Sequence, residues 1–276
     1  MAFAGGGSAG AKRIPARKRW GQHFLADPGT GERIAAAARL SSSDTVIEVG
    51  PGEGGLTRPL LVRVRRLLAI EIDPLRVDLL SRELGGEPHL RLLTGDVLEK
   101  SFSAWLAAVG WEAPAVLVGT LPYNAATKIL LRALEDPESV ERAVAVVQRE
   151  VARRFAAKPG SPDYGYLSVR AASVARTRIL FDLPPGAFRP RPRVTSSVLE
   201  LSPRSPALDS SLRRRALELA SAGFRSRRKT FSNALSSAGG RGRWEGALSE
   251  LGLDPRVRAE ELSLEDYLAL ARREKP

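Results

Sequence analysis

The chain is poor in the residues that hold metals and form disulfides. Its 276 residues include no cysteine and only two histidines, His23 and His89. Disulfides, thiolate catalysis and Cys-ligated zinc or iron–sulfur clusters are therefore excluded, and we predict no metal site. No apolar run approaches 18 residues. We therefore expect no membrane span and a cytoplasmic location.

The charge of the chain is strongly of one sign. It has 43 Lys and Arg against 31 Asp and Glu, a net charge of +12. A globular protein this basic most often binds a polyanion, and nucleic acid is the first expectation; the alternative is a basic surface that only aids solubility. Residues 1–20 carry five basic residues and no acid, without the apolar centre of a secretory signal. They faintly resemble an organelle transit peptide, but we interpret them as a flexible basic arm.

From Thr45 onward, short apolar runs alternate with Gly-rich turns and helical segments. This βαβ pattern predicts a mostly parallel sheet with helices on both faces. The expected strands are 45–49, 67–72, 89–93, 115–119, 143–147, 175–181 and 194–201.

A linker rich in Ser and Pro, residues 202–206, separates these strands from a Leu-, Ala- and Arg-rich remainder. We therefore divide the chain into the arm at 1–20, a catalytic domain at 21–203 and a small helical domain at 204–276.

A glycine turn follows the first expected strand. Gly50-x-Gly52-x-x-Gly55 matches a nucleotide-binding fingerprint, and Glu71 lies about twenty residues on, where an acid can bind ribose hydroxyls. This pattern fits NAD, FAD or S-adenosylmethionine. Glu48 favours the last, because an acid before the glycines suits a cationic ligand and repels pyrophosphate. Asp96, after the third strand, is placed to bind an adenine amino group.

Thr120-Leu121-Pro122-Tyr123, at the end of the fourth strand, predicts a trap for a flat ring that carries an amine. The proline fixes the backbone and has no N–H, which leaves nearby carbonyls free as acceptors. The tyrosine offers a stacking face. Since ligands bind at the carboxyl ends of strands in such sheets, the trap and the acids are expected to share one edge.

Several motifs together resemble the KsgA-type small-subunit ribosomal RNA adenine dimethyltransferases over residues 20–236. They are Gly21-Gln22-His23-Phe24-Leu25, Glu48-Val49-Gly50-Pro51-Gly52, Glu71-Ile72-Asp73, Gly95-Asp96, Thr120-Leu121-Pro122-Tyr123, Phe188-x-Pro190-x-Pro192-x-Val194-x-Ser196 and Phe224-x-x-Arg227-Arg228-Lys229-Thr230. One residue departs from the family pattern, because Thr120 stands where the family has Asn.

The resemblance implies a methyltransferase with a Rossmann-like, mostly parallel seven-stranded sheet and a small C-terminal helical domain. It implies S-adenosylmethionine as cofactor, N6,N6-dimethylation of two adjacent adenosines near the 3′ end of the small-subunit rRNA, and a pre-30S particle as partner. We expect a monomer. Tyr123 and Phe188 would flank the base beside Thr120, Leu121 and Pro122. The expected cofactor contacts are Gln22, His23, Leu25, Glu48, Gly50, Gly52, Glu71, Ile72, Asp96, Val97 and Thr120.

Residues 212–230 carry seven basic residues and one acid. The functional interpretation is contact with rRNA phosphates, with Arg225, Arg227, Arg228 and Lys229 as the candidates. The alternative is a solvated helix face.

Three other functions stay open from the sequence. A nicotinamide-dependent oxidoreductase would explain the glycine turn and Glu71, but neither the amine trap nor the basic tail. A non-catalytic ribosome-assembly or transcription factor on the same fold stays an alternative, because Thr120 replaces the Asn of the family pattern. A large-subunit rRNA methylase of the antibiotic-resistance type would share the catalytic motifs but not the tail motif at 224–230.

Overall fold

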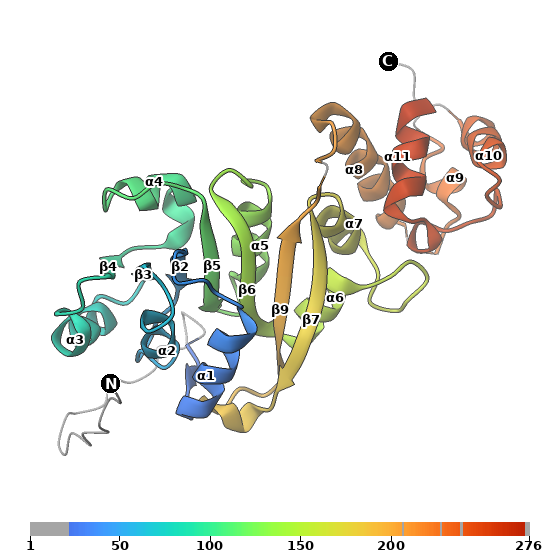
Figure 1. Ribbon diagram of the computed structural model, residues 1–276. Coiled ribbons are helices and arrows are strands. Elements are labelled where there is room, and N and C mark those ends of the chain that lie inside the picture. The colour runs from blue at the N-terminus through green and yellow to red at the C-terminus, as the bar shows by residue number, and fades with distance from the viewer. Residues whose placement is uncertain (1–21, 206, 227, 238–239, 274–276) are drawn as a thin grey trace.

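The computed structural model describes residues 22–205, 207–226, 228–237 and 240–273 (Figure 1). The predicted basic arm at 1–20 lies outside the described residues. Within the described ranges, no helix combines the length and the apolar character needed to cross a bilayer.

A seven-stranded sheet forms the centre of the fold, with the spatial order β4-β3-β2-β5-β6-β9-β7. Neighbours from β4 to β6 are parallel, whereas β9 runs antiparallel to both β6 and β7. Its strands are β2 Thr45–Val49, β3 Arg66–Glu71, β4 Leu90–Thr94, β5 Ala115–Thr120, β6 Val140–Gln148, β7 Ala175–Leu183 and β9 Ser196–Pro203. The predicted mostly parallel, seven-stranded α/β sheet is confirmed.

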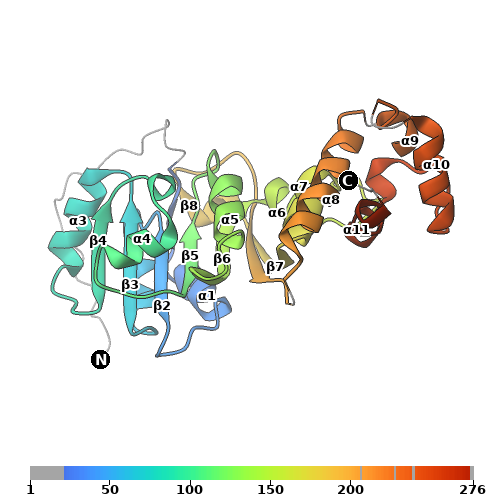
Figure 2. The ribbon, with the colours of Figure 1, turned by 90° about the horizontal axis from the view of Figure 1, so that it is seen from above.

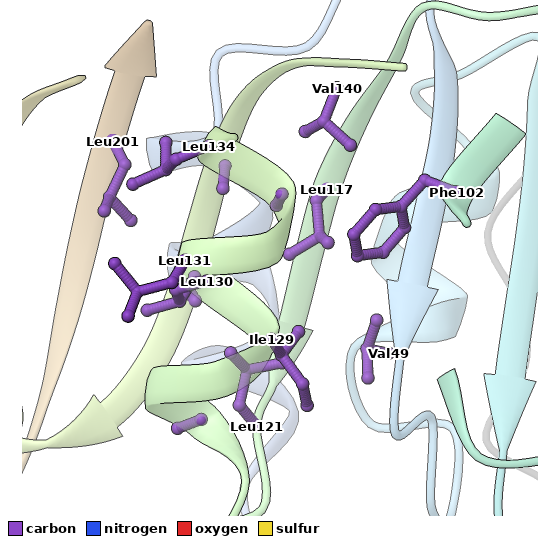
Figure 3. Close-up of a cluster of buried hydrophobic side chains, with 14 of the residues drawn as sticks. Val49, Phe102, Leu117, Leu121, Ile129, Leu130, Leu131, Leu134, Val140 and Leu201 are labelled. Carbon is purple, nitrogen blue, oxygen red and sulfur yellow. The ribbon is translucent and has the colours of Figure 1, made fainter. Parts of the chain in front are cut away.

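Helices cover both faces of the sheet, because each central strand is apolar on both sides. One buried cluster joins side chains of α4, α5, α6 and α7 to the sheet, and Figure 3 shows α5 packed there. A second cluster joins α1, α2 and α3 to the opposite face. The helices are α1 Pro28–Ala37, α2 Thr57–Leu61, α3 Pro74–Leu84, α4 Phe102–Ala107, α5 Ala126–Leu134, α6 Arg149–Ala156 and α7 Tyr166–Ala172, with 3-10 turns η2 Val97–Glu99 and η3 Pro185–Ala187.

After β9 the described chain is helical. A third buried cluster holds these helices together and also includes Tyr164 and Val169, so its core extends to α7. Figures 1 and 2 place this helical part at the far end of the molecule from α3 and β4. Its elements are α8 Ser210–Phe224, α9 Phe231–Ala234, α10 Arg241–Glu250, η4 Ala259–Glu261 and α11 Leu264–Arg273.

A two-stranded sheet that the sequence analysis did not predict joins distant segments. β1 Phe24–Leu25 pairs antiparallel with β8 Phe188–Arg189. Because β7 ends and β9 begins at the edge where β2 to β6 end, the Pro-rich segment between them lies at that edge. The pairing of β1 with β8 therefore brings the start of the described chain to the carboxyl edge of the sheet.

Candidate active site

A cavity opens at the carboxyl edge of the sheet, where the glycine turn, the strand-end acids and the trap segment meet. It is bounded by residues from six separate segments of the chain. The lining residues are Gln22, His23, Phe24, Val49, Gly50, Ile70, Glu71, Ile72, Gly95, Asp96, Val97, Thr120, Pro122, Asn124, Ala125 and Ile129.

Glu71, at the end of β3, is held in place by the backbone. One carboxylate oxygen accepts from the Gly52 N–H at 3.1 Å and the other from the Asp73 N–H at 3.0 Å. A carboxylate has about four lone-pair sites, so both oxygens keep capacity for a further donor. Burial raises the pKa of Glu71, and the backbone donors oppose that shift. The arrangement suits a pair of hydroxyl groups presented from the cavity.

Asp96 and Ile72 form the wall beside Glu71. One oxygen of Asp96 accepts from the Leu98 N–H at 2.9 Å, which fixes the carboxylate at the cavity. The turn is supported from below by Trp105, whose indole N–H donates to the Val97 carbonyl at 3.1 Å. Ile72 is a large apolar side chain left 38 % exposed. An acceptor beside an exposed apolar surface suits a flat aromatic ring that carries an amine.

The glycine turn allows one left-handed backbone conformation and one close approach that a side chain would hinder. Gly50 has φ +72°, and a Cβ on Gly52 would lie 2.4 Å from the ring of Phe24. The same ring lies under the buried guanidinium of Arg76, 4.3 Å from the ring centroid, and Arg76 pairs with Glu53 at 2.7 Å. The segment that carries Gln22 and His23 is thereby packed on the turn.

Thr120 and Leu121 supply acceptors at the start of the trap. Thr120 lines the cavity, and its buried hydroxyl has no hydrogen-bond partner among the described residues. The Pro122 carbonyl is engaged, because it accepts from the N–H groups of Ala125 and Ala126. In the described part of the chain no donor reaches the Leu121 carbonyl, so this oxygen and the buried Thr120 hydroxyl are two acceptors without a partner there.

Tyr123 is fixed by residues that lie far away in the sequence. Its hydroxyl lies 2.7 Å from the hydroxyl of Ser196, and burial raises the pKa of the phenol, so it stays neutral. The ring of His23 stacks on it, with centroids 5.2 Å apart. His23 Nδ1 in turn donates to the Pro190 carbonyl at 2.7 Å. Three segments thus hold the ring of Tyr123, which does not itself line the cavity but adjoins the lining residues His23, Pro122 and Asn124.

Not every predicted site residue lines this cavity. Leu25 faces a smaller neighbouring hollow, and Gly52 acts through its N–H on Glu71. Phe188 is 1 % exposed and packs in the second buried cluster, so its ring is not open to a base in this structure. Leu121 is also buried, and only its backbone can serve the trap.

Glu48 lies beneath the cavity rather than in it. Its carboxyl group is 1 % exposed, it does not line the cavity, and it lies beside the equally buried hydroxyl of Thr57. Burial raises its pKa to about 8. The idea that this acid faces a cationic ligand finds no contact here, because the alternation of β2 turns Glu48 to the side of α1 and α2 while Val49 faces the cavity.

The predicted RNA-binding residues follow α8. Arg225, Arg228 and Lys229 are exposed, and Arg227 lies outside the described residues. Arg225 also lines a groove between α7 and α8 with Arg213 and Arg214. No acid pairs with Arg213, Arg214 or Arg225 in the ranges that the structure describes.

The sequence analysis missed several cavity residues. Asn124, Ala125 and Ile129 follow the trap directly, so their position after a strand end was the available signal. The contact of Tyr123 with Ser196 had no such signal, because 73 residues separate them.

An open, mostly parallel sheet with a glycine turn, a strand-end acid and a cavity at its carboxyl edge defines a Rossmann-like protein that binds a nucleotide or S-adenosylmethionine. Comparison with known proteins narrows this class. Residues 14–274 match the family profile "Ribosomal RNA adenine dimethylase", and the chain belongs to this family.

Curated relatives agree over nearly the whole length. Two proteins called "Ribosomal RNA small subunit methyltransferase A" are 40 % identical (Methylococcus capsulatus; 96 % of this chain and 100 % of the relative) and 42 % identical (Rubrobacter xylanophilus; 94 % and 95 %). The solved 23S rRNA methyltransferase ErmE is 30 % identical with a TM-score of 0.72, over 91 % of this chain and 98 % of ErmE. A Plasmodium falciparum dimethyladenosine transferase, 21 % identical with a TM-score of 0.76 over 90 % and 96 %, shares the fold. The family and relatives favour the methyltransferase over the oxidoreductase and the non-catalytic factor.

Proposed function

We propose that this protein transfers methyl groups from S-adenosylmethionine to N6 of two adjacent adenosines near the 3′ end of small-subunit rRNA. The observation that carries the proposal is the meeting of Thr120 with Glu71, at the end of β3, and Asp96, the residue that caps η2, in one cavity. The unpartnered, buried hydroxyl of Thr120 supports it further, because such a group costs stability unless a ligand supplies the donor.

The cofactor half of the site is assigned to Glu71, Ile72, Asp96 and Val97, with Gly50 closing the turn. Glu71 would accept from the ribose hydroxyls, and Asp96 from the adenine amino group, while Ile72 and Val97 cover the ring. When bound, S-adenosylmethionine supplies a methyl group that the sulfonium charge activates. The strand-end acids and the exposed face of Ile72 fit such a nucleoside.

The base half acts on the target amine. The N6 lone pair of adenine is delocalised into the ring, which makes the nitrogen a poor nucleophile. The Thr120 hydroxyl and the Leu121 carbonyl would accept hydrogen bonds from the two N–H groups of N6. These bonds would favour a more nucleophilic nitrogen. Positioning and electrostatics then supply most of the catalysis, and the acidified N6 loses its proton to water.

Tyr123 offers the stacking surface for the base once it has left its own stack. Flipping costs a few kcal/mol, and stacking on one aromatic side chain returns about 1–3 kcal/mol. The ring is already held by Ser196, so little ordering remains when the base arrives. The prediction that Phe188 covers the other face of the base would require its buried ring to move.

The rRNA itself is the proposed partner, within a pre-30S particle and with a monomeric enzyme. The exposed, basic residues Arg225, Arg228 and Lys229 support phosphate contacts that position the enzyme. We further propose a cytoplasmic, metal-free enzyme. In the described ranges, no three His, Asp or Glu side chains are grouped to hold a metal ion.

A large-subunit rRNA methylase is the second candidate, because ErmE shares 30 % of its residues with this chain. A radioactive methyl-transfer assay separates the two. Small and large ribosomal subunits from a strain lacking its own dimethyltransferase are incubated with the protein and labelled S-adenosylmethionine. We expect label in small-subunit rRNA; label only in the large subunit would overturn the proposal.

Thr120→Val tests the observation that carries the proposal. Valine keeps the shape of threonine but removes the orphan hydroxyl. We expect methyl transfer to fall about tenfold, while the free energy of unfolding rises by about 1 kcal/mol because an unsatisfied buried group is gone. A variant as active as the parent would show that Thr120 does not act on the amine.

A further inference from the structure

Three arginines lie on the Pro-rich segment whose backbone contacts Phe24 and His23, two residues that line the cavity. Between Asp182 and Glu200 the chain has Arg189, Arg191 and Arg193 and no acid. All three are exposed, and Figure 1 shows this segment, in gold, at the lower edge of the sheet beside α1. We call Arg189, Arg191 and Arg193 the arginine rim.

The segment that carries the rim is fastened to the site at both ends. At its start β8 pairs with β1, so Arg189 is opposite Phe24 and the buried Phe188 anchors the strand. In the middle, the Pro190 carbonyl accepts from His23. At its end, Ser196 holds the hydroxyl of Tyr123. The segment that carries the rim is therefore attached through hydrogen bonds to His23, which lines the cavity, and to Tyr123, which stacks on His23.

The rim charges are not neutralised within the described part of the chain. Asp182, the acid that precedes the segment, pairs with Arg149 at 3.7 Å and accepts from Ser197 at 2.6 Å. Elsewhere two exposed arginines, Arg39 and Arg178, both reach one acid, Glu200. Beside the rim, Val194 is a large apolar side chain left 44 % exposed.

We propose that the arginine rim binds phosphates of the RNA strand that carries the target adenosine, with Val194 against an adjoining sugar or base. This inference rests on the proposed function and adds a binding site to it. The tail patch at Arg225, Arg228 and Lys229 lies in the helical part, away from the cavity. The rim is thus placed to align the strand locally, whereas the tail holds the particle.

Charge reversal of two rim residues, Arg191→Glu with Arg193→Glu, tests the proposal. Arg189 is spared because it belongs to β8. The matched control is Arg65→Glu with Arg82→Glu: both residues are exposed, no acid pairs with either in the described ranges, and they lie near the opposite edge of the sheet. Both double variants change the net charge by the same amount. A third variant, Arg191→Lys with Arg193→Lys, keeps the charge.

Two readouts are needed. The first is kcat/KM for methyl transfer to small subunits at several salt concentrations, with S-adenosylhomocysteine affinity as a check on the cofactor half. The second is equilibrium binding of a labelled single-stranded RNA of about twelve nucleotides with two adjacent adenosines, which needs no activity. We expect the rim reversal to lower kcat/KM and RNA affinity by about tenfold or more each. The slope of log affinity against log salt concentration should decrease in size by about 0.7–0.9 for each phosphate contact that is lost.

We expect weak RNA binding and low kcat/KM for the rim-reversal variant, values like those of the parent for the control, and values close to the parent for the lysine variant. S-adenosylhomocysteine affinity should be unchanged in all three. Equal RNA binding and equal salt slopes for the rim reversal and its control would overturn the inference. If the parent protein methylates no rRNA, the proposed function fails, while the oligonucleotide measurement still decides the rim.

Discussion

The two halves of the cavity are built in different ways. The cofactor half is held by local backbone contacts: Glu71 accepts from Gly52 and Asp73, and Asp96 accepts from Leu98. The base half is held by side chains from distant segments: Tyr123 contacts Ser196 and His23, and His23 contacts Pro190. The cofactor half is therefore fixed by individual strand ends, whereas the base half exists only once the whole sheet and β1 are in place.

Removal of the Tyr123 ring is the strongest way to break the base half alone. For Tyr123→Ala we expect methyl transfer to fall about 100-fold, since stacking of the flipped base is worth about 1–3 kcal/mol and the ring also orders its neighbours. S-adenosylhomocysteine affinity, measured by calorimetry, should stay within about twofold. Tyr123→Phe is the matched control, which keeps the ring and should lose much less. Unchanged methyl transfer by Tyr123→Ala would contradict the assignment of Tyr123 to the site that binds the target base.

Glu71→Gln breaks the cofactor half instead. Glutamine keeps one oxygen but turns an NH₂ toward a backbone N–H, so one fixed contact becomes repulsive. We expect S-adenosylhomocysteine affinity to fall about tenfold to 100-fold, because hydrogen bonds to charged groups are worth about 1.5–3 kcal/mol. At saturating cofactor, kcat should be close to that of the parent. The exposed Glu99→Gln serves as control. Normal cofactor affinity in Glu71→Gln would contradict the assignment.

Two neighbouring serines sharpen the comparison. Ser196 and Ser197 are both fully buried on β9, but Ser196 holds Tyr123 and Ser197 holds Asp182. For Ser196→Ala we expect kcat to fall about threefold to tenfold, the equivalent of one hydrogen bond, with cofactor affinity unchanged. Ser197→Ala removes an equally buried hydroxyl and should leave kcat unchanged. Equal kcat values for the two variants would mean that Ser196 does not position Tyr123.

Glu48 is buried beneath the cofactor half, so we expect its substitution to change the stability of the fold and not methyl transfer. Burial raises its pKa from 4.5 to about 8, so the unfolded state releases this proton at lower pH than the folded state does. The stability contributed by this group is therefore full below about pH 4.5 and decreases as the pH rises to about 8. Relative to the parent, the free energy of unfolding of Glu48→Gln should be higher by on the order of 3 kcal/mol at pH 8.5 and nearly the same at pH 5. Urea unfolding at both pH values measures this, and a difference that does not change with pH would contradict it.

The same division explains how much the sequence could predict. The strands and the strand-end acids follow from short patterns of apolar residues and glycine, and the structure confirms the sheet that these patterns predict. The pairing of β1 with β8 and the contact between Tyr123 and Ser196 join residues that are 73 or more positions apart. No local pattern encodes them. The burial of Phe188 and the turn of Glu48 away from the cavity likewise depend on which face of a strand is covered.

The central claim is that the two halves meet at Thr120 to methylate adenine N6 in small-subunit rRNA. Mass mapping of rRNA fragments tests it directly, after the protein has acted on small subunits from a strain without its own dimethyltransferase. The account predicts two adjacent N6,N6-dimethyladenosines in the 3′-terminal fragment, present with the parent protein and strongly reduced with Tyr123→Ala. An unmodified 3′ fragment, or methyl groups on another base or atom, would contradict it.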